Sequence, residues 1–166
     1  MLEGYAHKFG DNISTDQIAP GRYYHLRSRL PELAKHVLED ADPQFAARLK
    51  SGDLVVAGRN FGLGSSREHA AAIIKLAGVG AVLAASVARI FFRNAINVGL
   101  PIIVCDTSGI AAGDFLRVDL GQGVVEDVTR GLQLTVAPLP PVMLRILKDG
   151  GLVAHVKRYG RLAVEG

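Results

Sequence analysis

Apolar and polar stretches alternate along the middle of the chain in a pattern that predicts strands separated by helices. Three short apolar runs have the length of buried strands and cover residues 54–57, 81–85 and 101–105. Two longer segments between them have the composition of helices and cover residues 66–77 and 87–97. This strand-helix-strand-helix-strand order favours a parallel sheet whose strands are connected by crossover helices.

The segments on either side of this core follow other patterns. In the first third, we expect a strand at residues 2–9, a polar turn at 11–16 and a loop at 22–29. Two short helices are expected at residues 31–39 and 42–50. Three short strands with glycine-containing turns between them follow at residues 115–120, 124–128 and 132–137, which indicates an antiparallel meander. A last helix is expected between Pro140 and Gly150, and residues 152–159 are expected to form a final strand.

Composition places the chain among ordinary globular proteins. Its 166 residues, 49% hydrophobic and 21% charged, fit one domain spanning residues 1–166. A net charge of +3 without a Lys/Arg block gives a nucleic-acid role little support. No apolar run reaches the ~18 residues of a membrane span, and the N-terminus lacks a signal-peptide pattern, so we expect a cytoplasmic protein without membrane partners. Cys105, the single cysteine, cannot hold a zinc ion or an iron–sulfur cluster by itself and is expected to be a small buried hydrophobe.

Candidate chemistry is concentrated in a glycine-rich loop after the first buried strand. Residues 58–70 read Gly-Arg-Asn-Phe-Gly-Leu-Gly-Ser-Ser-Arg-Glu-His-Ala and lead into a predicted helix. Free N–H groups at the start of a helix attract anions, and an arginine side chain can bind a carboxylate through two parallel hydrogen bonds. The sequence therefore predicts a site for a small carboxylate or phosphate.

Three explanations compete for this loop. Nucleotide binding is disfavoured because no lysine follows Gly64 as in a P-loop, and the Gly-x-Gly-x-x-Gly fingerprint is incomplete. A purely structural explanation is a capping box, in which Ser65 caps the helix and Glu68 reaches back. Carboxylate recognition also accounts for the paired glycines, the second serine and Arg67. In that case Ser65, held near positive charge and backbone donors, could take a proton from carbon.

The loop and two further segments resemble the swivelling domain of the aconitase superfamily. Within it, they are most similar to the small-subunit family that serves 3-isopropylmalate dehydratases and homoaconitases. Residues 11–18, Asp-Asn-Ile-Ser-Thr-Asp-Gln-Ile, are similar to that family's early Thr-Asp motif. Residues 86–101 are similar to its Ser-x-Ala-Arg-Ile-Phe-x-x-Asn segment. The three segments occur in the family order, and the similarity spans nearly the whole chain.

The resemblance implies an α/β fold of the swivelling β/β/α type, with a mostly parallel central sheet, crossover helices and an antiparallel β-meander. It also implies one half of a hydro-lyase that dehydrates and rehydrates a hydroxy dicarboxylic acid. A large-subunit partner would carry a [4Fe-4S] cluster on its own cysteines, where the cluster acts as a Lewis acid, and this chain would bind no cofactor.

The resemblance also assigns roles by motif position. Ser65 would be the base, and Asp16 would belong to the acid/base network near the cluster. Arg67 would bind a substrate carboxylate, with Ser66 and the backbone around Gly64 assisting. Two structural alternatives stay open, because Asp16 could only close a turn and Ser65 could only cap the helix.

Substrate choice is expected to depend on the segment Tyr23-Tyr24-His25-Leu26-Arg27. Homoaconitase-type small subunits place an arginine here for an extra carboxylate, and the isopropylmalate type has apolar residues; the aligned position in this chain is His25. Tyr24, His25 and Arg27 are therefore candidate substrate-binding residues. Family-level analogy favours 3-isopropylmalate and leucine biosynthesis, with homoaconitate or a related alkylmalate as the alternative. A stand-alone carboxylate- or phosphate-binding module and an interaction domain remain the alternatives from other classes.

Overall fold

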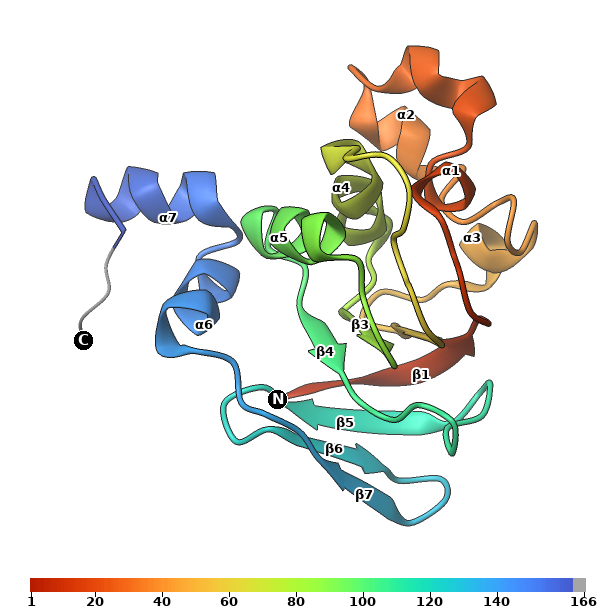
Figure 1. The fold of residues 1–166 in the computed structure, drawn as a ribbon, viewed down its shortest axis with the longest axis vertical. Coiled ribbons are helices and arrows are strands. Elements are labelled where there is room, and N and C mark those ends of the chain that lie inside the picture. Colours follow the sequence, from red (N-terminus) through yellow and green to blue (C-terminus); the bar gives the residue numbers. More distant parts are fainter. Residues whose placement is uncertain (163–166) are drawn as a thin grey trace.

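A computed structural model describes residues 1–162 and builds them around one seven-stranded sheet (Figure 1). The strands are β1 (Leu2–Lys8), β2 (Leu54–Ala57), β3 (Ala81–Ala84), β4 (Ile102–Val104), β5 (Phe115–Asp119), β6 (Val124–Asp127) and β7 (Leu132–Thr135). Their order across the sheet is β4-β3-β2-β1-β5-β6-β7. Strands β1 to β4 are parallel, whereas β5, β6 and β7 continue from β1 as an antiparallel meander. The predicted fold class is confirmed.

The helices are α1 (Thr15–Ile18), the 3-10 helix η1 (Gly21–Leu26), α2 (Leu30–Ala34), α3 (Phe45–Arg48), α4 (Glu68–Ala77), α5 (Arg89–Asn97), α6 (Pro141–Lys148) and α7 (Leu152–Tyr159). Helices α4 and α5 are the predicted crossovers and lie side by side on one face of the parallel strands (Figure 1). Helices α6 and α7 follow the meander and extend to the side of α5 (Figure 1). Within residues 1–162, none of these helices is long and apolar enough to cross a membrane.

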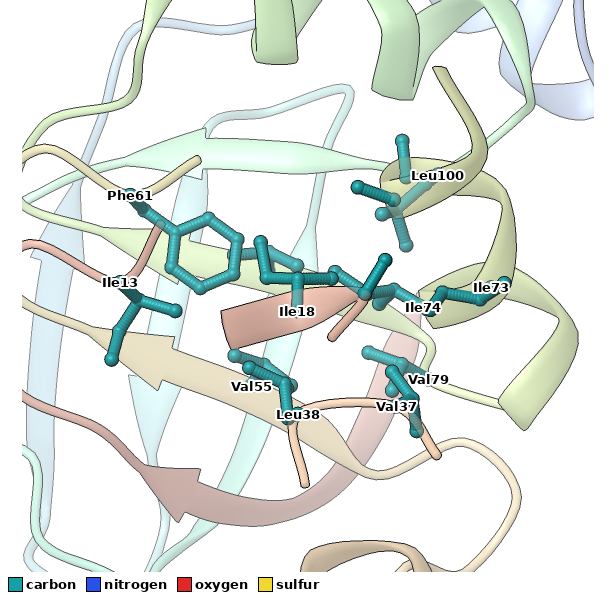
Figure 2. Packing of buried hydrophobic residues seen from close by; sticks show 14 of the residues in the cluster. Ile13, Ile18, Val37, Leu38, Val55, Phe61, Ile73, Ile74, Val79 and Leu100 are labelled. Atoms are coloured by element: carbon teal, nitrogen blue, oxygen red, sulfur yellow. The ribbon is translucent and has the colours of Figure 1, made fainter. Parts of the chain in front are cut away.

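Strand β2 is buried on both faces of the sheet. Val55 and Ala57 join an apolar cluster with α1, α4, α5 and Phe61, part of which is shown in Figure 2. Leu54 and Val56 join a second cluster on the opposite face, which β5 and β6 complete. Central parallel strands covered on both faces need continuous apolar runs, and this requirement explains the sequence pattern that predicted them.

The N-terminal third differs from its prediction in one respect that matters for the site. The segment expected to be a loop at residues 22–29 contains η1, in which the N–H of Tyr23 donates to the carbonyl of Pro20 at 2.9 Å. Tyr23 then stacks on His36, with 3.7 Å between the ring centroids. The aromatic residues thus order this segment by packing rather than by periodicity. Helices α2 and α3 are shorter than predicted.

The final strand expected at residues 152–159 is wrong, because these residues form α7. The helix begins after Gly151, and the N–H of His155 donates to the carbonyl of Gly151 at 3.0 Å. The side chain of His155 is fully buried, and its Nδ1 lies 2.8 Å from a carboxylate oxygen of Asp149, directly after α6. Packing of this polar pair between helices overrides the strand preference of the valines and the tyrosine.

Candidate active site

Each of the three sequence motifs directly follows a parallel strand. The segment 11–18 follows β1, the glycine-rich loop follows β2, and the segment that begins at Ser86 follows β3. The carboxyl ends of neighbouring parallel strands lie at one edge of a sheet, where open α/β sheets bind their ligands. Motifs far apart in the sequence therefore meet at this edge.

Backbone hydrogen bonds hold the motifs together. The N–H of Gly62 donates to the carbonyl of Ile13 at 2.7 Å, and the N–H of Thr15 donates to the carbonyl of Leu63 at 2.9 Å. A third hydrogen bond joins the loop to the segment after β3: the N–H of Phe61 donates to the carbonyl of Ser86 at 3.1 Å. The loop is thus fixed against the first motif over several residues before it reaches its serines.

Gly62 and Gly64 are required by the backbone of the loop. Gly62 has a φ of +79°, and a Cβ at this position would collide with the ring of Phe91. Gly64 has a φ of +111°, and a Cβ there would lie only 3.1 Å from Oγ1 of Thr15. Glycine adopts such positive φ values readily, whereas other residues rarely do. The paired glycines bring residues 65–67 close to α1.

The predicted capping box is wrong. Helix α4 begins at Glu68, and its N-cap residue is Arg67, which makes no side-chain capping hydrogen bond. Ser65 lies too early in the chain to cap this helix, and its Oγ instead lies 3.2 Å from Oγ1 of Thr15. Ser65 and Ser66 are both exposed. The structure therefore leaves both hydroxyls available to a ligand beside the start of α4.

The guanidinium group of Arg67 is held by several neighbours. Its Nη1 lies 2.6 Å from Oδ1 of Asp16 and donates to the carbonyl of Ala19 at 3.4 Å. Its centre lies 5.4 Å from the ring centroid of Tyr24, within range of a cation–π interaction. Only 24% of the Arg67 side chain is exposed. The arginine is preorganised, and the contacts with Asp16 and Ala19 use one of its three nitrogens.

A second guanidinium group lies against the same tyrosine. Arg27 lies 4.2 Å from the ring centroid of Tyr24, and its Nη1 donates to the Tyr24 carbonyl at 3.1 Å. The ring of His69 meets the edge of Tyr24 at 6.0 Å between centroids. Burial lowers the pKa of His69, and the positive charges of Arg67 and Arg27 lower it further. Both effects favour the neutral imidazole, and the two arginines supply the positive charge near the ring.

Tyr24, Arg67 and His69 line an open pocket of about 610 Å³, and Asp16 and Arg27 lie outside its lining. Its lining residues are Gly21, Tyr24, Ser65, Ser66, Arg67, Glu68 and His69. His25 is exposed and does not belong to this lining, so its part in substrate choice stays a prediction. A different cavity of about 280 Å³ lies between β4 and residues 136–140, but its lining is almost entirely apolar and suits no anion.

Comparison with known protein families decides the relationship of this chain. Residues 6–106, more than half of its length, match the aconitase C-terminal domain. The chain belongs to the aconitase C-terminal domain family. The matched range contains all three motifs and every residue of the pocket.

Relatives in this aconitase-type family resemble the chain over nearly its whole length. It is 61% identical to the 3-isopropylmalate dehydratase small subunit 2 of Archaeoglobus fulgidus, covering 98% of this chain and 99% of the relative. It is 57% identical to the 3-isopropylmalate dehydratase small subunit 1 of Thermotoga maritima, with coverage of 96% and 97%. A crystal structure of 3-isopropylmalate dehydratase (leuD) from Methanocaldococcus jannaschii superposes with a TM-score of 0.89 at 42% identity, covering 96% of this chain and 95% of that one.

The residues of this aconitase-type domain do not fit an iron–sulfur cluster. In the part of the chain that the structure describes, no group of three or more His, Cys, Asp or Glu side chains could hold a metal ion. Burial raises the pKa of the Cys105 thiol to about 11, so the thiolate that a cluster needs is disfavoured. Cys105 also packs against the second apolar cluster, on the face of the sheet away from α4.

Sequence reasoning named most of the residues that the structure brings together and missed two. It gave Thr15 no role, although this residue precedes Asp16 in the first motif and touches Ser65. His69 was not assigned to the site from the sequence, and the structure places it in the pocket lining. The adjacency of Thr15 to Asp16 was a usable signal, but only the three-dimensional contact gives it a meaning.

Proposed function

We propose that this protein is the small subunit of 3-isopropylmalate dehydratase, a hydro-lyase of leucine biosynthesis that interconverts 2-isopropylmalate and 3-isopropylmalate by dehydration and rehydration. The observation that carries the proposal is one open pocket that combines the exposed hydroxyl of Ser65 with the guanidinium group of Arg67, while Arg27 packs on the pocket residue Tyr24. Near-complete coverage by relatives with that name supports it.

Carboxylate binding falls to the two arginines. The Nη1 of Arg67 is occupied by Asp16 and Ala19, and no other acceptor of this guanidinium is found within residues 1–162. The remaining Nε and Nη2 donors can bind one carboxylate through two parallel hydrogen bonds. Arg27, fixed against Tyr24, supplies positive charge for the second carboxylate. Isopropylmalate carries two carboxylates, so the number of arginines matches it.

Proton transfer falls to Ser65. A serine alkoxide is unstable in water, but nearby guanidinium groups and backbone N–H donors at the start of α4 reduce the cost of forming it. Ser65 then removes the proton α to the bound carboxylate and returns it during rehydration. Ser66 and the backbone around Gly64 would hold the carboxylate whose charge increases. Asp16 would act mainly by orienting Arg67.

The other half of the reaction requires a partner. We infer that a large subunit supplies the [4Fe-4S] cluster and covers the open side of the pocket, because this chain contributes only carboxylate binding and a base. The enzyme would then be active only as the assembled pair, in the cytoplasm. The printed names of the relatives, which designate small subunits, support such an assembly.

One alternative substrate follows from the same pocket. Homoaconitate has a third carboxylate, which would require a further cation near Tyr24. His25, like Arg27, is exposed and outside the pocket lining, but within the described residues it makes no ring contact or hydrogen bond with Tyr24, so it fits this role less well than Arg27. A stand-alone anion-binding module is the alternative from another class. It would use the same arginines without a partner.

The test uses the chain assembled with its large subunit and compares 2-isopropylmalate with homoaconitate as substrates. We expect a clear preference in kcat/KM for isopropylmalate. Ser65→Ala should lower kcat about 10²- to 10⁴-fold with little change in KM, as expected for loss of a general base. Ser108→Ala, an exposed serine in the loop after β4, is the matched control and should leave both constants unchanged.

Two outcomes would contradict the proposal. Retention of most of the activity by Ser65→Ala would remove its role as base. Tight calorimetric binding of isopropylmalate or phosphate by the isolated chain, without any turnover by the assembled pair, would favour the binding module.

A further inference from the structure

A buried hydroxyl lies directly beneath the exposed Ser65. Thr15 is 1% exposed, and its Oγ1 lies 3.2 Å from Oγ of Ser65. No other hydrogen-bond partner for the Thr15 hydroxyl is found among the residues that the structure describes. The contact therefore joins a buried group on the inner side of Ser65 to a side chain whose outer side opens into the pocket.

The backbone of Thr15 is fixed on both sides. Its N–H donates to the carbonyl of Leu63 at 2.9 Å, and its carbonyl accepts the N–H of Ala19 at 2.9 Å. The start of α1 is further held by a capping box between Ser14 and Gln17. A threonine side chain has few rotamers because it branches at Cβ. The hydroxyl of Thr15 is thus a rigid group placed against a loop.

The space for this contact depends on the glycine before Ser65. A Cβ on Gly64 would come within 3.1 Å of Oγ1 of Thr15, which is tighter than ordinary contact. A side chain at position 64 would therefore crowd the hydroxyl, and glycine leaves this space free. Thr15 in α1 and Gly64 after β2 lie far apart in the sequence, and together they orient the side chain of Ser65.

We propose that Thr15 is a positioning residue that directs the Ser65 hydroxyl toward the substrate and stabilises its deprotonated form. Thr15 donates its hydrogen bond to Oγ of Ser65, so the remaining lone pairs of that oxygen point to the open side of the pocket. A hydrogen bond to a charged oxygen is stronger than one to a neutral hydroxyl, so the donor favours the alkoxide over the alcohol. Thr15 keeps its own proton throughout, and the proton taken from the substrate resides on Ser65.

Burial makes this role difficult for water to replace. With Thr15 hidden from solvent, a variant lacking the hydroxyl would present an apolar surface to the inner side of Ser65. This inference rests on the proposed role of Ser65 as base. A purely structural role for Thr15, packing α1 beside Ile18, would depend on its shape and not on its hydroxyl.

The experiment uses the complete complex with the large subunit and the substrate 2-isopropylmalate. Thr15→Val keeps the shape and the branching and removes the hydroxyl. We expect kcat to fall about 10- to 100-fold while KM stays within about twofold, as for loss of a hydrogen bond to a charged group. In Thr15→Val, the part of the pH profile where kcat increases with pH should move to higher pH, because the Thr15 hydroxyl no longer lowers the pKa of Ser65.

Further variants separate the hydroxyl from packing. Thr15→Ser should retain most of the activity, and Thr15→Ala should lose it, although both lack the methyl group. If Thr15→Val fails to fold or assemble, this serine–alanine comparison provides the same test. Ser65→Ala combined with Thr15→Val should be no slower than Ser65→Ala alone, because the threonine acts through the serine.

The possible failures are distinguishable. If Ser65→Ala is inactive but Thr15→Val keeps the wild-type kcat and pH profile, the positioning role is overturned and the proposed function stands. Equal activities for Thr15→Ser and Thr15→Ala would overturn it in the same way. If Ser65→Ala is itself active, the base assignment fails, and the role of Thr15 fails with it.

Discussion

Arg67 shows how one side chain is prepared before any ligand arrives. Asp16, Ala19 and Tyr24 hold its guanidinium group, and most of the side chain is buried. The partner carboxylate of Asp16 is 67% exposed, so the ion pair contributes little to folding stability. Its value lies in orientation, because a fixed fork loses less entropy when it binds a carboxylate.

Replacing this fork by a point charge tests the carboxylate assignment. We expect Arg67→Lys to raise KM for isopropylmalate by roughly 10- to 100-fold, since the lysine cannot form two parallel hydrogen bonds or stack on Tyr24 in the same way. Steady-state kinetics of the assembled enzyme would measure it. Arg117→Lys, an exposed arginine on β5 paired with Glu3, is the control and should leave KM unchanged. An unchanged KM in Arg67→Lys would contradict the assignment.

The roles of single residues were predictable from the sequence where a motif carried them. Ser65 and Arg67 stand at motif positions, and the structure places both in one pocket. Their chemical roles stay predictions. The contact between Thr15 and Ser65 joins residues fifty positions apart. No local pattern contains it, because it depends on how β1 and β2 are placed side by side.

At the scale of elements, the loop between β2 and α4 depends on the helix after β3. Phe91 of α5 is buried against the loop, and its ring meets that of Phe61 at 5.3 Å between centroids. The position of Gly62 leaves no room for a side chain beside this pair. Elements from two crossovers thus fix the loop jointly.

A matched pair of glycine substitutions measures this dependence. Gly62 and Gly113 have φ values of +79° and +87°, but a Cβ on Gly113 would meet no atom within 4 Å. Alanine at either position costs ~1–2 kcal/mol for the backbone conformation. We expect Gly62→Ala to cost about 1–3 kcal/mol more than Gly113→Ala, because it also overpacks Phe91. Urea unfolding would measure both, and equal losses of stability would show that the ring moves aside freely.

The prediction of helices and strands from the sequence succeeded where burial alone explains the pattern of apolar residues. The apolar runs of β2 and β3 are buried on both faces, and β5 and β6 alternate as half-covered strands do. It failed for α7, where residues with strand preference form a helix because His155 is buried against Asp149. It also failed for the cap of α4, because the Ser-x-x-Glu pattern occurs just before the point at which the helix begins.

At the scale of the whole molecule, a buried carboxyl pair makes stability depend on pH. Asp127 is 3% exposed, and within the described chain its Oδ2 has no hydrogen-bond partner. Burial raises the pKa of Asp127, and the neighbouring Asp114 raises it further. The pKa of Asp114 is lowered instead, first by the backbone N–H of Ala111 and also by Arg130. The opposite directions mean that, of the two carboxyl groups, Asp127 holds a proton more readily than Asp114.

The sign of the effect follows from the raised pKa. A group that holds its proton more tightly in the folded state stabilises the fold below its unfolded pKa, 3.8 for Asp127, and this contribution is lost as pH rises through the folded value. We expect Asp127→Asn to raise the free energy of unfolding at pH 7 by roughly 1 kcal/mol, because the amide stays neutral and can still accept the N–H of Arg130. The difference in free energy of unfolding between Asp127→Asn and the wild type should become smaller at acidic pH. Denaturant curves at pH 4 and pH 7 would measure it, and a variant less stable at both would contradict it.

The burial of β2 and β3 has a consequence for how this protein can change over time. Both strands are closed in by helices on one face and by the meander on the other, while the proposed site residues lie outside the strands, in segments that follow β1 and β2. Segments outside the buried strands tolerate changes in sequence better than the strands themselves. Substitutions that alter catalysis therefore need not disturb the fold of this molecule. New substrates can be explored by changes in the segment Tyr23–Arg27 while the buried strands keep their shape.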